Sequence, residues 1–378
     1  MKLVYCIHSI YNPGGMERVL LNKTAWLRRH GWEVSIVTTD QHGRPPFYPF
    51  PEGVSITDLG INYSDDNIKS PLRKVLGYSR RRRAHRKALA DYLFNTKPDI
   101  TISLYPSESS FIPNIRDGSR KVLELHYNRF FRLLYGRTGL LRYADLWRTR
   151  RDPCIVSKFD KFVVLTEEDA SLWGRIPNLT VIPNAALKPE GAISDGTPHR
   201  VIAVGRLDYQ KGFDRLLAIW KDVMRKESLQ DWKLDIFGQG EWEGRLKDLI
   251  RKFGIDGSAT IHKPVSDIGK EYSGSSILVM TSHYEGFPMV MLEGMASGLP
   301  AISFDFMCGP KDIIREGWNG CIVPDGDLGL FSEKLAALME NEERRKAMSR
   351  NAAVIAQTYS EEKVMDRWSR LFESMQKE

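Results

Sequence analysis

The chain has 378 residues, of which 42% are hydrophobic and 27% charged, and its formal net charge is +7. This length exceeds the size at which one hydrophobic core keeps growing, so we expect two domains, and the ordinary composition excludes a disordered protein. Its four cysteines, Cys6, Cys154, Cys308 and Cys321, are scattered, which excludes a disulfide scaffold or a paired zinc-site spacing and favours a reducing, cytoplasmic setting.

The first residues, MKLVYCIHSI, contain a short apolar run that includes His8 and continues into Asn12-Pro13-Gly14-Gly15. Because no small-residue cleavage site follows, we interpret the run as a buried strand and not as a signal peptide. No stretch of the sequence reaches the roughly 18 to 20 consecutive apolar residues that span a bilayer. We therefore expect any membrane contact to be peripheral.

The first half of the chain alternates strand-like and helix-like segments. A helix expected over 16–30 is ended by Gly31 and separates the first two strands, which gives a βαβ unit. Strands are expected over 3–9, 33–39, 100–104, 121–125, 161–165 and 180–182. This alternation predicts an α/β domain.

Two segments of the first half concentrate positive charge. Residues 69–87 contain nine Lys or Arg and no acid, with apolar residues at helical spacing, which predicts a basic amphipathic helix. Residues 129–151 interleave arginines with leucines and aromatic residues; the arginines are Arg129, Arg132, Arg137, Arg142, Arg148, Arg150 and Arg151. A solvated helix face is the ordinary explanation of a charge run, but the lack of acids beside apolar residues favours docking to anionic lipid. Nucleic acid is the alternative partner, and no recognition module accompanies the charge.

Residues 188–199, KPEGAISDGTPH, lack apolar periodicity and suit an exposed linker. We therefore expect an N-terminal domain over 1–187 and a C-terminal domain over 200–357. In the second half, strands are expected over 201–204, 233–237, 259–262, 277–281, 300–304 and 320–323, and the final helices over 328–340, 342–357 and 360–376. This half predicts a second parallel α/β domain, whose ligands should bind at the carboxyl ends of the strands.

The segment YEGFPMVMLEGMASG follows one of these buried strands and places Glu285 at the strand end and Glu293 farther along a helix. A helix that begins near Pro288 would leave the amides of Met289 and Val290 unpaired, which makes an anion site. Each glutamate alone is an ordinary loop or helix acid. Together, two carboxylates beside an anion site suit sugar hydroxyls on either side of a diphosphate, as in a nucleotide sugar.

A second motif, GRLDYQKG, follows the first strand of the second half. Arg206 and Lys211 lie at a strand end and a helix start, where they can neutralise a diphosphate. The competing interpretation is two surface cations at a turn. Gly205 and Gly212, which allow a close approach of the backbone, weigh against it.

The pairing of GRLDYQKGFDRLL with EGFPMVMLEGMASGLP resembles the retaining GT4 family of GT-B glycosyltransferases, of the type that acts in bacterial surface-polysaccharide assembly. The first half agrees through the glycine-rich turn at residues 13–18 and through His126. The resemblance implies two Rossmann-like parallel-sheet domains that face each other across a cleft. It further implies that the C-terminal segment, 358–378, packs back toward the N-terminal domain.

The resemblance also implies roles for residues of the second half. Glu293 would bind the ribose hydroxyls, and Arg206 and Lys211 would hold the diphosphate. The donor sugar would be held by Glu285 and by the backbone of Gly286, Phe287 and Met289. Near the nucleotide, the backbone of His262 and Lys263 would meet the base, and Gly238 would form a tight turn that lines the cleft. Gly238-Gln239-Gly240 lacks the third glycine of a dinucleotide fingerprint, which argues against an NAD-dependent dehydrogenase.

In the first half, the resemblance implies that His126 contacts the donor sugar and that Gly15 lets backbone amides approach the phosphate or acceptor. A core histidine at a strand end is the competing interpretation of His126. Asp325-Gly326-Asp327 could be mistaken for a metal site, but Asp327 stands where a helix cap belongs. The resemblance therefore implies no metal or other cofactor.

The expected reaction is transfer of a hexose or N-acetylhexosamine with retention. The resemblance implies that Arg206, Lys211 and helix amides stabilise the diphosphate leaving group. Glu285, Arg206, Lys211 and His126 are the expected catalytic residues. No enzymic nucleophile is evident, which favours front-face displacement over a covalent intermediate on Glu285. By analogy, SFDFMCGPKDII favours a UDP-sugar, and Lys311 and Asp312 would approach the sugar.

The expected acceptor is a saccharide linked to a lipid diphosphate, and the expected location is the cytoplasmic face of the cell membrane. Two other classes of function remain as alternatives. A nucleotide-sugar epimerase would share the fold and the nucleotide site, but it needs no acceptor and leaves the basic first half unexplained. A non-enzymatic nucleotide-binding membrane scaffold would not need the complete set of Arg206, Lys211, Glu285 and Glu293.

Overall fold

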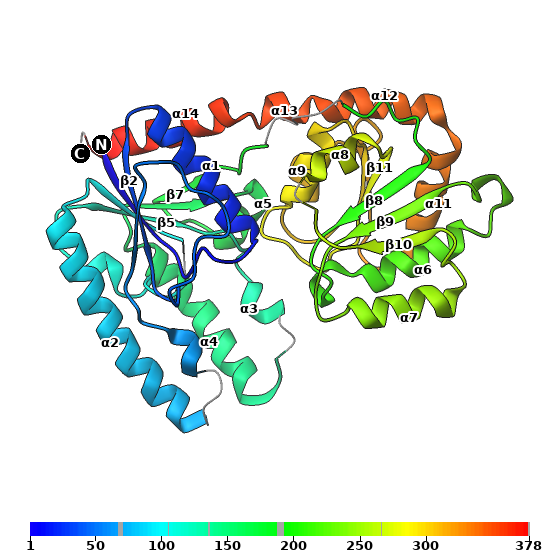
Figure 1. Ribbon diagram of the computed structural model, residues 1–378. Coiled ribbons are helices and arrows are strands. Elements are labelled where there is room, and N and C mark those ends of the chain that lie inside the picture. Colours follow the sequence, from blue (N-terminus) through cyan, green and yellow to red (C-terminus); the bar gives the residue numbers. More distant parts are fainter. Residues whose placement is uncertain (67–70, 105, 135–136, 187–192, 266, 377–378) are drawn as a thin grey trace. The chain divides into compact units, whose positions relative to one another are not determined.

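The computed structural model of the protein describes residues 1–66, 71–104, 106–134, 137–186, 193–265 and 267–376. The chain divides into two compact units (Figure 1). The first unit contains Met1–Pro183 together with Met365–Glu378, and the second contains Asn184–Val364. The end of the chain therefore packs with the N-terminal unit, as the resemblance implied.

The first unit is built on a sheet of seven parallel strands in the order β3-β2-β1-β4-β5-β6-β7. The strands are β1 (Lys2–Cys6), β2 (Glu33–Thr38), β3 (Ser55–Asp58), β4 (Ile100–Ser103), β5 (Arg120–Glu124), β6 (Lys161–Val164) and β7 (Leu179–Val181). Six of them were predicted, with ends that differ by three residues at β1 and by one residue or none elsewhere. The edge strand β3 was missed because its sequence, SITD, is mostly exposed and lacks an apolar run.

Helices cover both faces of the first sheet. The α-helices are α1 (Gly15–Arg29), α2 (Pro71–Thr96), α3 (Phe131–Leu134), α4 (Gly139–Val156), α5 (Glu167–Trp173) and α14 (Glu361–Gln376), with 3-10 helices η1 (Tyr63–Asp66) and η2 (Ile112–Asn114). On one face, Val4 and Leu123 of the sheet share a core cluster with Leu89 of α2 and Val156 of α4. Because side chains alternate along a strand, the next residues point to the opposite face, where α1 and α14 pack.

The second unit is built on a sheet of six parallel strands in the order β10-β9-β8-β11-β12-β13. The strands are β8 (Arg200–Val204), β9 (Lys233–Phe237), β10 (Ala259–His262), β11 (Ile277–Met280), β12 (Ala301–Phe304) and β13 (Gly320–Val323). All six were predicted to within one residue at each end. The expectation of two Rossmann-like parallel-sheet domains is confirmed.

The α-helices of the second unit are α6 (Phe213–Val223), α7 (Glu243–Phe253), α8 (Ile268–Ser273), α9 (Met289–Ala296), α10 (Pro310–Ile313), α11 (Leu328–Glu340), α12 (Glu342–Ala353) and α13 (Ile355–Thr358), with 3-10 helices η3 (Tyr209–Lys211) and η4 (Glu227–Leu229). The helix expected over 342–357 is interrupted at Val354, and the two pieces, α12 and α13, both contact α9.

Of the segment expected to form a linker, 188–199, residues 188–192 lie outside the described residues. Its described part packs in the second unit. The Ser194 hydroxyl donates to the carbonyl oxygen of Ser275, and the buried guanidinium of Arg345 donates to the carbonyl oxygen of Gly196 at 2.7 Å.

Strand order locates the loops that matter for ligands. In the first sheet the order reverses between β1 and β4, and in the second between β8 and β11. Parallel α/β sheets bind ligands at such switch points, outside the carboxyl ends of the strands. In the second unit, the loops at this point are residues 205–212 after β8 and 281–288 after β11, which carry both predicted motifs.

Candidate active site

The loop after β8 is fixed against the end of β11. The Asp208 carboxylate accepts a hydrogen bond from the backbone amide of Lys211 at 3.3 Å and so caps η3. Gly212, with φ of +61°, turns the chain into α6, and a Cβ at this position would lie 2.2 Å from the carbonyl oxygen of Thr281. The hydroxyl of Thr281 in turn donates to the carbonyl oxygen of Gly212 at 2.9 Å. Only glycine fits here, so the glycine is what allows the two loops to lie this close together.

Lys211 and Glu285, predicted from separate motifs, meet in this arrangement. The Lys211 ammonium lies 2.6 Å from Oε1 of Glu285, whose side chain is buried. The same carboxylate accepts hydrogen bonds from the Ser282 hydroxyl at 2.7 Å and from the Gln210 amide at 3.3 Å. The Lys211 stem crosses Gly205, because a Cβ there would lie 3.0 Å from two of its carbons. A cation and a carboxylate are thus held in fixed positions at the carboxyl ends of β8 and β11.

Arg206 stands at the outer side of this pair. Its side chain is 70% exposed, and its guanidinium lies 3.4 Å from the Asp208 carboxylate. It also donates to the side-chain oxygen of Gln210 at 2.8 Å, so one glutamine links Arg206 to Glu285. The exposed guanidinium retains donors that can bind a ligand anion.

The start of α9 differs in detail from the prediction. Pro288 is the N-cap and not the first helical residue, and the amide of Met289 donates to the carbonyl oxygen of Phe287 at 2.9 Å. The expectation that the Met289 amide is unpaired is therefore wrong. Phe287 is buried against Tyr359, with ring centroids 6.2 Å apart.

Around this turn, Gly286, Met289, Val290 and Glu293 are all half-buried. Glu293 lies in the second turn of α9, and Glu285 lies in the loop before that helix. The two predicted glutamates therefore stand on either side of the helix start. Their roles toward a sugar nucleotide remain predictions.

The ends of β9 and β10 adjoin the same loop. A Cβ at Gly238 would lie 1.9 Å from the carbonyl oxygen of Gly205, so the turn after β9 can approach the loop after β8 only because residue 238 is glycine. The ring of His262 is stacked on Phe237, with centroids 4.7 Å apart, and its Nε2 lies 2.6 Å from the Asp235 carboxylate. These contacts fix the end of β10, where the backbone of His262 and of the exposed Lys263 was predicted to meet the base.

The two remaining predicted site residues, His126 and Gly15, belong to the first unit. His126 follows β5, its side chain is 7% exposed, and its Nε2 lies 3.1 Å from Oε1 of Glu124. Glu124 is fully buried and also pairs with the Lys23 ammonium at 2.6 Å. Burial alone would raise the pKa of Glu124, but the charges of Lys23 and His126 hold it at about 2. His126 is thus buried, as a core histidine would be, but its partner is an ionised carboxylate.

Gly15 is the first residue of α1, and a Cβ there would meet no atom within 4 Å. The carboxylate of Glu17, in the first turn of α1, folds back over Gly14. Burial raises the pKa of Glu17, and the charge of His126 opposes that rise. The helix start therefore lies beside an acid that is close enough to His126 to sense its charge.

Several partners of the predicted residues were missed. Gln210 and Ser282 donate to Glu285, and Asp235 pairs with His262. Glu124 pairs with His126, and Lys23 in turn pairs with Glu124. For Gln210, a signal was its place inside the motif GRLDYQKG, whereas Ser282 lies two residues before the motif YEGFPMVMLEGMASG. For Lys23, the signal was its position on the apolar stripe of α1, among Val19, Leu20, Thr24 and Leu27, all of which are buried.

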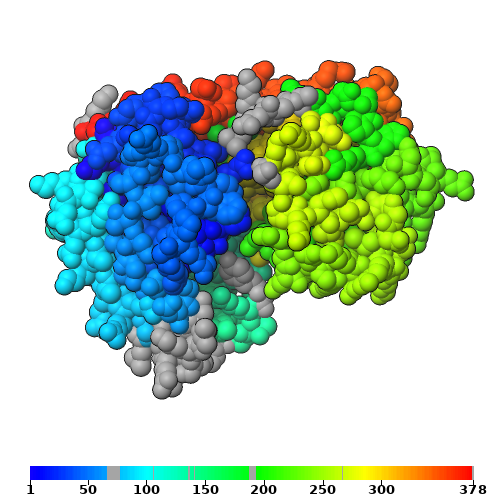
Figure 2. Space-filling view, viewed as in Figure 1, coloured from blue at the N-terminus to red at the C-terminus, as the bar shows by residue number. Residues whose placement is uncertain are grey.

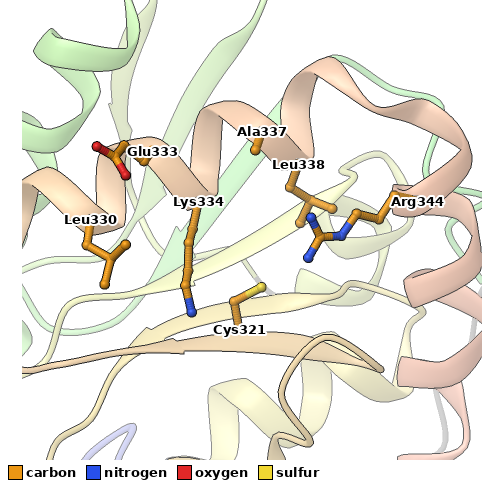
Figure 3. A pocket seen from close by; sticks show the side chains of 7 residues that line it. All are labelled: Cys321, Leu330, Glu333, Lys334, Ala337, Leu338 and Arg344. Atoms are coloured by element: carbon orange, nitrogen blue, oxygen red, sulfur yellow. The ribbon is translucent and has the colours of Figure 1, made fainter.

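A cavity of about 200 Å³ lies elsewhere in the second unit, between α11 and β13 (Figure 3). Its lining residues are Cys321, Leu330, Glu333, Lys334, Ala337, Leu338 and Arg344, none of which was predicted for the site. The Lys334 ammonium points toward β13, where it donates to the Glu316 carboxylate at 2.7 Å and to the carbonyl oxygen of Ile322 at 2.9 Å.

The two acids just before α11, Asp325 and Asp327, make structural contacts. Asp327 caps α11 by accepting from the amide of Leu330 at 3.0 Å, and Asp325 pairs with Arg215 at 2.7 Å. Within the described ranges, no group of three or more His, Cys, Asp or Glu side chains is placed to hold a metal ion.

The basic segments of the first unit differ in how they use their charge. Among residues 77–96 of α2, which forms part of the surface in Figure 2, the exposed cations are Arg80, Arg82, Arg83, Arg86 and Lys87, while residues 67–70 of the predicted basic segment lie outside the described ranges. In the second segment, Arg132 and Arg137 pair with the buried Asp152 and Asp145, and Arg129 donates to the backbone of α5.

The outer face of α4 carries the exposed part of the second segment. Its exposed cations are Arg142, Arg148, Arg150 and Arg151, and Leu141, Tyr143 and Trp147 beside them are also exposed, by 62%, 72% and 58%. Among the helices that the structure describes, none is long and apolar enough to cross a bilayer.

Comparison with known proteins agrees with this architecture. A family model described as "Glycosyltransferase Family 4" matches residues 13–186, and one described as "Glycosyl transferases group 1" matches residues 187–354. The amylovoran biosynthesis glycosyltransferase AmsD of Erwinia amylovora is 30% identical, and the match covers 97% of this chain and 98% of that protein. The lipopolysaccharide 1,6-galactosyltransferase of Salmonella typhimurium is 25% identical, and the match covers 90% of both chains.

Among solved structures, a TarM mutant of S. aureus in complex with fondaparinux, alpha-GlcNAc-glycerol and UDP has a TM-score of 0.77 and 15% identity, over 98% of this chain and 99% of that chain. This likeness shows the fold. From its family matches, its full-length relative and its paired parallel sheets, the chain belongs to the family 4 glycosyltransferases and has their GT-B fold.

Proposed function

We propose that the enzyme transfers a hexose or N-acetylhexosamine from a UDP-sugar to a saccharide acceptor, with retention of the anomeric configuration, in the assembly of a bacterial polysaccharide. The observation that carries the proposal is the Lys211–Glu285 pair, held at 2.6 Å at the carboxyl ends of β8 and β11. A cation and a carboxylate fixed side by side suit a ligand that presents phosphate oxygens next to sugar hydroxyls.

Lys211 can hold Glu285 and bind the diphosphate of such a ligand at the same time. Its ammonium has three donors, one of which is taken by Glu285, so others are available to the oxygens of a diphosphate. Arg206, with its exposed guanidinium, is the second cation of the proposed diphosphate site. The half-buried Glu293 would accept from the ribose hydroxyls, as the resemblance implies.

Glu285 is better suited to bind the sugar than to attack it. Its carboxylate accepts hydrogen bonds from Lys211, Ser282 and Gln210, which fix its position and withdraw charge from its oxygens. A nucleophile needs a free lone pair directed at the anomeric carbon. We therefore favour front-face displacement, in which the departing phosphate takes the proton of the acceptor hydroxyl while the new glycosidic bond forms on the same face.

Stabilisation of the leaving group would come from the protein. The bond between the anomeric carbon and the diphosphate breaks with the electron pair on oxygen, so negative charge grows beside Lys211 and Arg206. Preorganised cations at such a place commonly provide the largest part of catalysis. The proposed reaction needs no metal ion, and activity that survives treatment with EDTA is the expected result.

The relatives support the choice of UDP and of a polysaccharide pathway. One solved relative is described with UDP bound, and two curated relatives are described as acting in amylovoran biosynthesis and as a lipopolysaccharide galactosyltransferase. A saccharide linked to a lipid diphosphate is the acceptor that we propose, at the cytoplasmic face of the membrane. The exposed arginines of α4, with Trp147 and Tyr143 beside them, suit the interface of an anionic bilayer.

The donor site is tested by thermal stabilisation and by hydrolysis of a panel of UDP- and GDP-sugars, with UDP and GDP alone as controls. We expect stabilisation by UDP and by one class of UDP-sugar, and its loss in Lys211→Ala and Glu293→Ala. Arg225→Ala, at an exposed position on the same unit, is the matched control. If no nucleotide stabilises the folded protein, the proposed donor site is wrong.

The membrane surface is tested by flotation with vesicles of phosphatidylcholine alone or mixed with phosphatidylglycerol. We expect binding to the anionic vesicles, reduced in Trp147→Ala and unchanged in Phe47→Ala, which removes an equally exposed aromatic side chain of the first unit. Equal binding of wild type and Trp147→Ala would remove α4 from the proposed membrane surface.

A further inference from the structure

The first unit contains a buried polar group that extends inward from His126. Glu124, at the end of β5, is fully buried and has two partners: its Oε1 lies 2.6 Å from the Lys23 ammonium and 3.1 Å from Nε2 of His126. The second oxygen of Glu124 accepts from Lys23 at 2.7 Å. One carboxylate thus binds a lysine of α1 and the histidine that was predicted to contact the donor sugar.

The contact defines which nitrogen of His126 is available. A carboxylate can only accept, so Nε2 must carry a proton, and in the neutral ring Nδ1 is then an acceptor. Among the residues that the structure describes, Glu124 is the one side chain that forms an ion pair or hydrogen bond with the His126 ring. A sugar hydroxyl that approaches the ring would therefore meet a defined nitrogen.

Lys23 keeps this carboxylate ionised, and an aromatic ring encloses the pair. The ammonium lies 3.5 Å from the ring centroid of Trp368, which is almost fully buried and belongs to α14 at the end of the chain. The centroid of the Tyr5 ring lies 6.0 Å from the same nitrogen. Such a dry setting strengthens the attraction between Lys23 and Glu124, and the pKa of Glu124 stays at about 2 despite its burial.

We propose that Glu124 is a positioning residue for glycosyl transfer: it holds His126 with Nε2 protonated, so that Nδ1 is presented to the donor sugar, and Lys23 under Trp368 keeps Glu124 in place. This inference rests on the proposed role of His126. The arrangement follows the logic by which a buried carboxylate orients a histidine in other enzymes, where it fixes the tautomer without reacting itself. Glu17 is a second acid whose pKa responds to the charge of His126, which opposes the rise that burial causes.

The first test replaces Glu124 by its isosteric amide. Glu124→Gln can turn its amide nitrogen toward the ring, which favours the tautomer with the proton on Nδ1. We expect kcat to fall by about 10-fold or more, as for loss of one charge-assisted hydrogen bond, while the affinity for UDP is unchanged. The matched control is Asp117→Asn, which breaks another buried acid–lysine pair of this unit, with Lys121 at the start of β5.

A spectroscopic measurement separates positioning from stability. Long-range proton–nitrogen correlation spectra report which ring nitrogen is protonated, and the signals of His126, one of eight histidines, are assigned by their loss in His126→Gln. We expect the wild type to have Nε2 protonated, Glu124→Gln to move the proton toward Nδ1, and Asp117→Asn to leave the ring unchanged.

A double variant guards against simple unfolding. Lys23→Met with Glu124→Leu replaces both charges by apolar side chains of similar volume, which buried pairs often tolerate. It should fold and still bind UDP, but with reduced kcat. If the folded Glu124→Gln protein keeps both wild-type kcat and the wild-type ring signals while His126→Gln is impaired, the positioning role is overturned and the donor site stands. If Lys211→Ala keeps full turnover, it is the proposed function that fails.

Discussion

The two units contain the same elementary pair, a lysine 2.6 Å from a glutamate, in different surroundings. In the first unit Lys23 and Glu124 are almost fully buried, and an aromatic ring from α14 lies against the ammonium. In the second unit Lys211 and Glu285 lie on two loops at the ends of strands, beside the exposed Arg206. In the roles that we propose, the enclosed pair positions another side chain, whereas the pair at the loop ends binds the ligand.

The largest effect on stability should come from removing one residue of the enclosed pair, Lys23 and Glu124. Lys23→Ala leaves the Glu124 charge buried without its principal counter-ion, and we expect a loss of about 3–5 kcal/mol in the free energy of unfolding. Urea denaturation measures it. A loss below about 1 kcal/mol would mean that water or another cation replaces Lys23, and the contrast between the two pairs would disappear.

The enclosed pair should also set the acid stability. The pKa of Glu124 is about 2 against the ordinary 4.5, because Lys23 and His126 outweigh the effect of burial. A carboxyl group with a depressed pKa stabilises the fold above its unfolded pKa, and this contribution is lost as the pH falls from about 4.5 through about 2. Denaturation followed between pH 5 and pH 2 should show that decline, and Glu124→Gln should lack this component.

In the pair on the loops, Lys211 and Glu285, loss of the lysine should lower activity strongly and stability only a little. In Lys211→Ala we expect kcat to fall by about 10²- to 10³-fold, the range for one preorganised group that stabilises a transition state. The free energy of unfolding should change less than in Lys23→Ala, because the Lys211 and Glu285 side chains are nearer to solvent and Glu285 keeps its bonds to Ser282 and Gln210. Equal stability losses in the two lysine variants would contradict the comparison.

The smallest contrast concerns two glycines of the predicted site. Gly212→Ala forces a Cβ to within 2.2 Å of the Thr281 carbonyl oxygen at a φ of +61°, and we expect a loss of about 1–3 kcal/mol together with reduced activity. Gly15→Ala places its Cβ in open space at the start of α1, so stability should change by less than about 0.5 kcal/mol. If Gly15→Ala nevertheless abolishes turnover, a ligand must approach that Cβ position closely.

The sequence predicted the sheets better than the partners of the site residues. Buried parallel strands are continuous apolar runs, so twelve of thirteen were recognised, and the missed strand, β3, is an exposed edge. The motifs likewise placed Lys211 and Glu285 at the ends of two strands, and the sheet order shows that these strands are neighbours. The distance between Lys211 and Glu285 depends on the close approach of Gly212 to Thr281. The spacing of residues along the sequence does not predict that approach.

Lys23 and Glu124 escaped prediction for a different reason. They are 101 residues apart, and a lysine in a helix or a glutamate in a strand is ordinarily solvated. The local clue was that Lys23 falls on the buried stripe of α1, which calls for a partner because an unpaired buried charge is costly. That argument identifies the need for an acid, and only the fold shows which acid it is.

The placement of α14 has a consequence for biosynthesis. Trp368 and Phe372 of this helix pack in the unit that also contains the first strand, against Lys23 and Trp32, so this unit is assembled from the two ends of the chain. On the ribosome, the N-terminal sheet must wait, with the surface around Lys23 uncovered, until the whole of the second unit has been translated and α14 has emerged. The second unit, continuous in sequence, can finish folding first, and the N-terminal unit is completed last although it is made first.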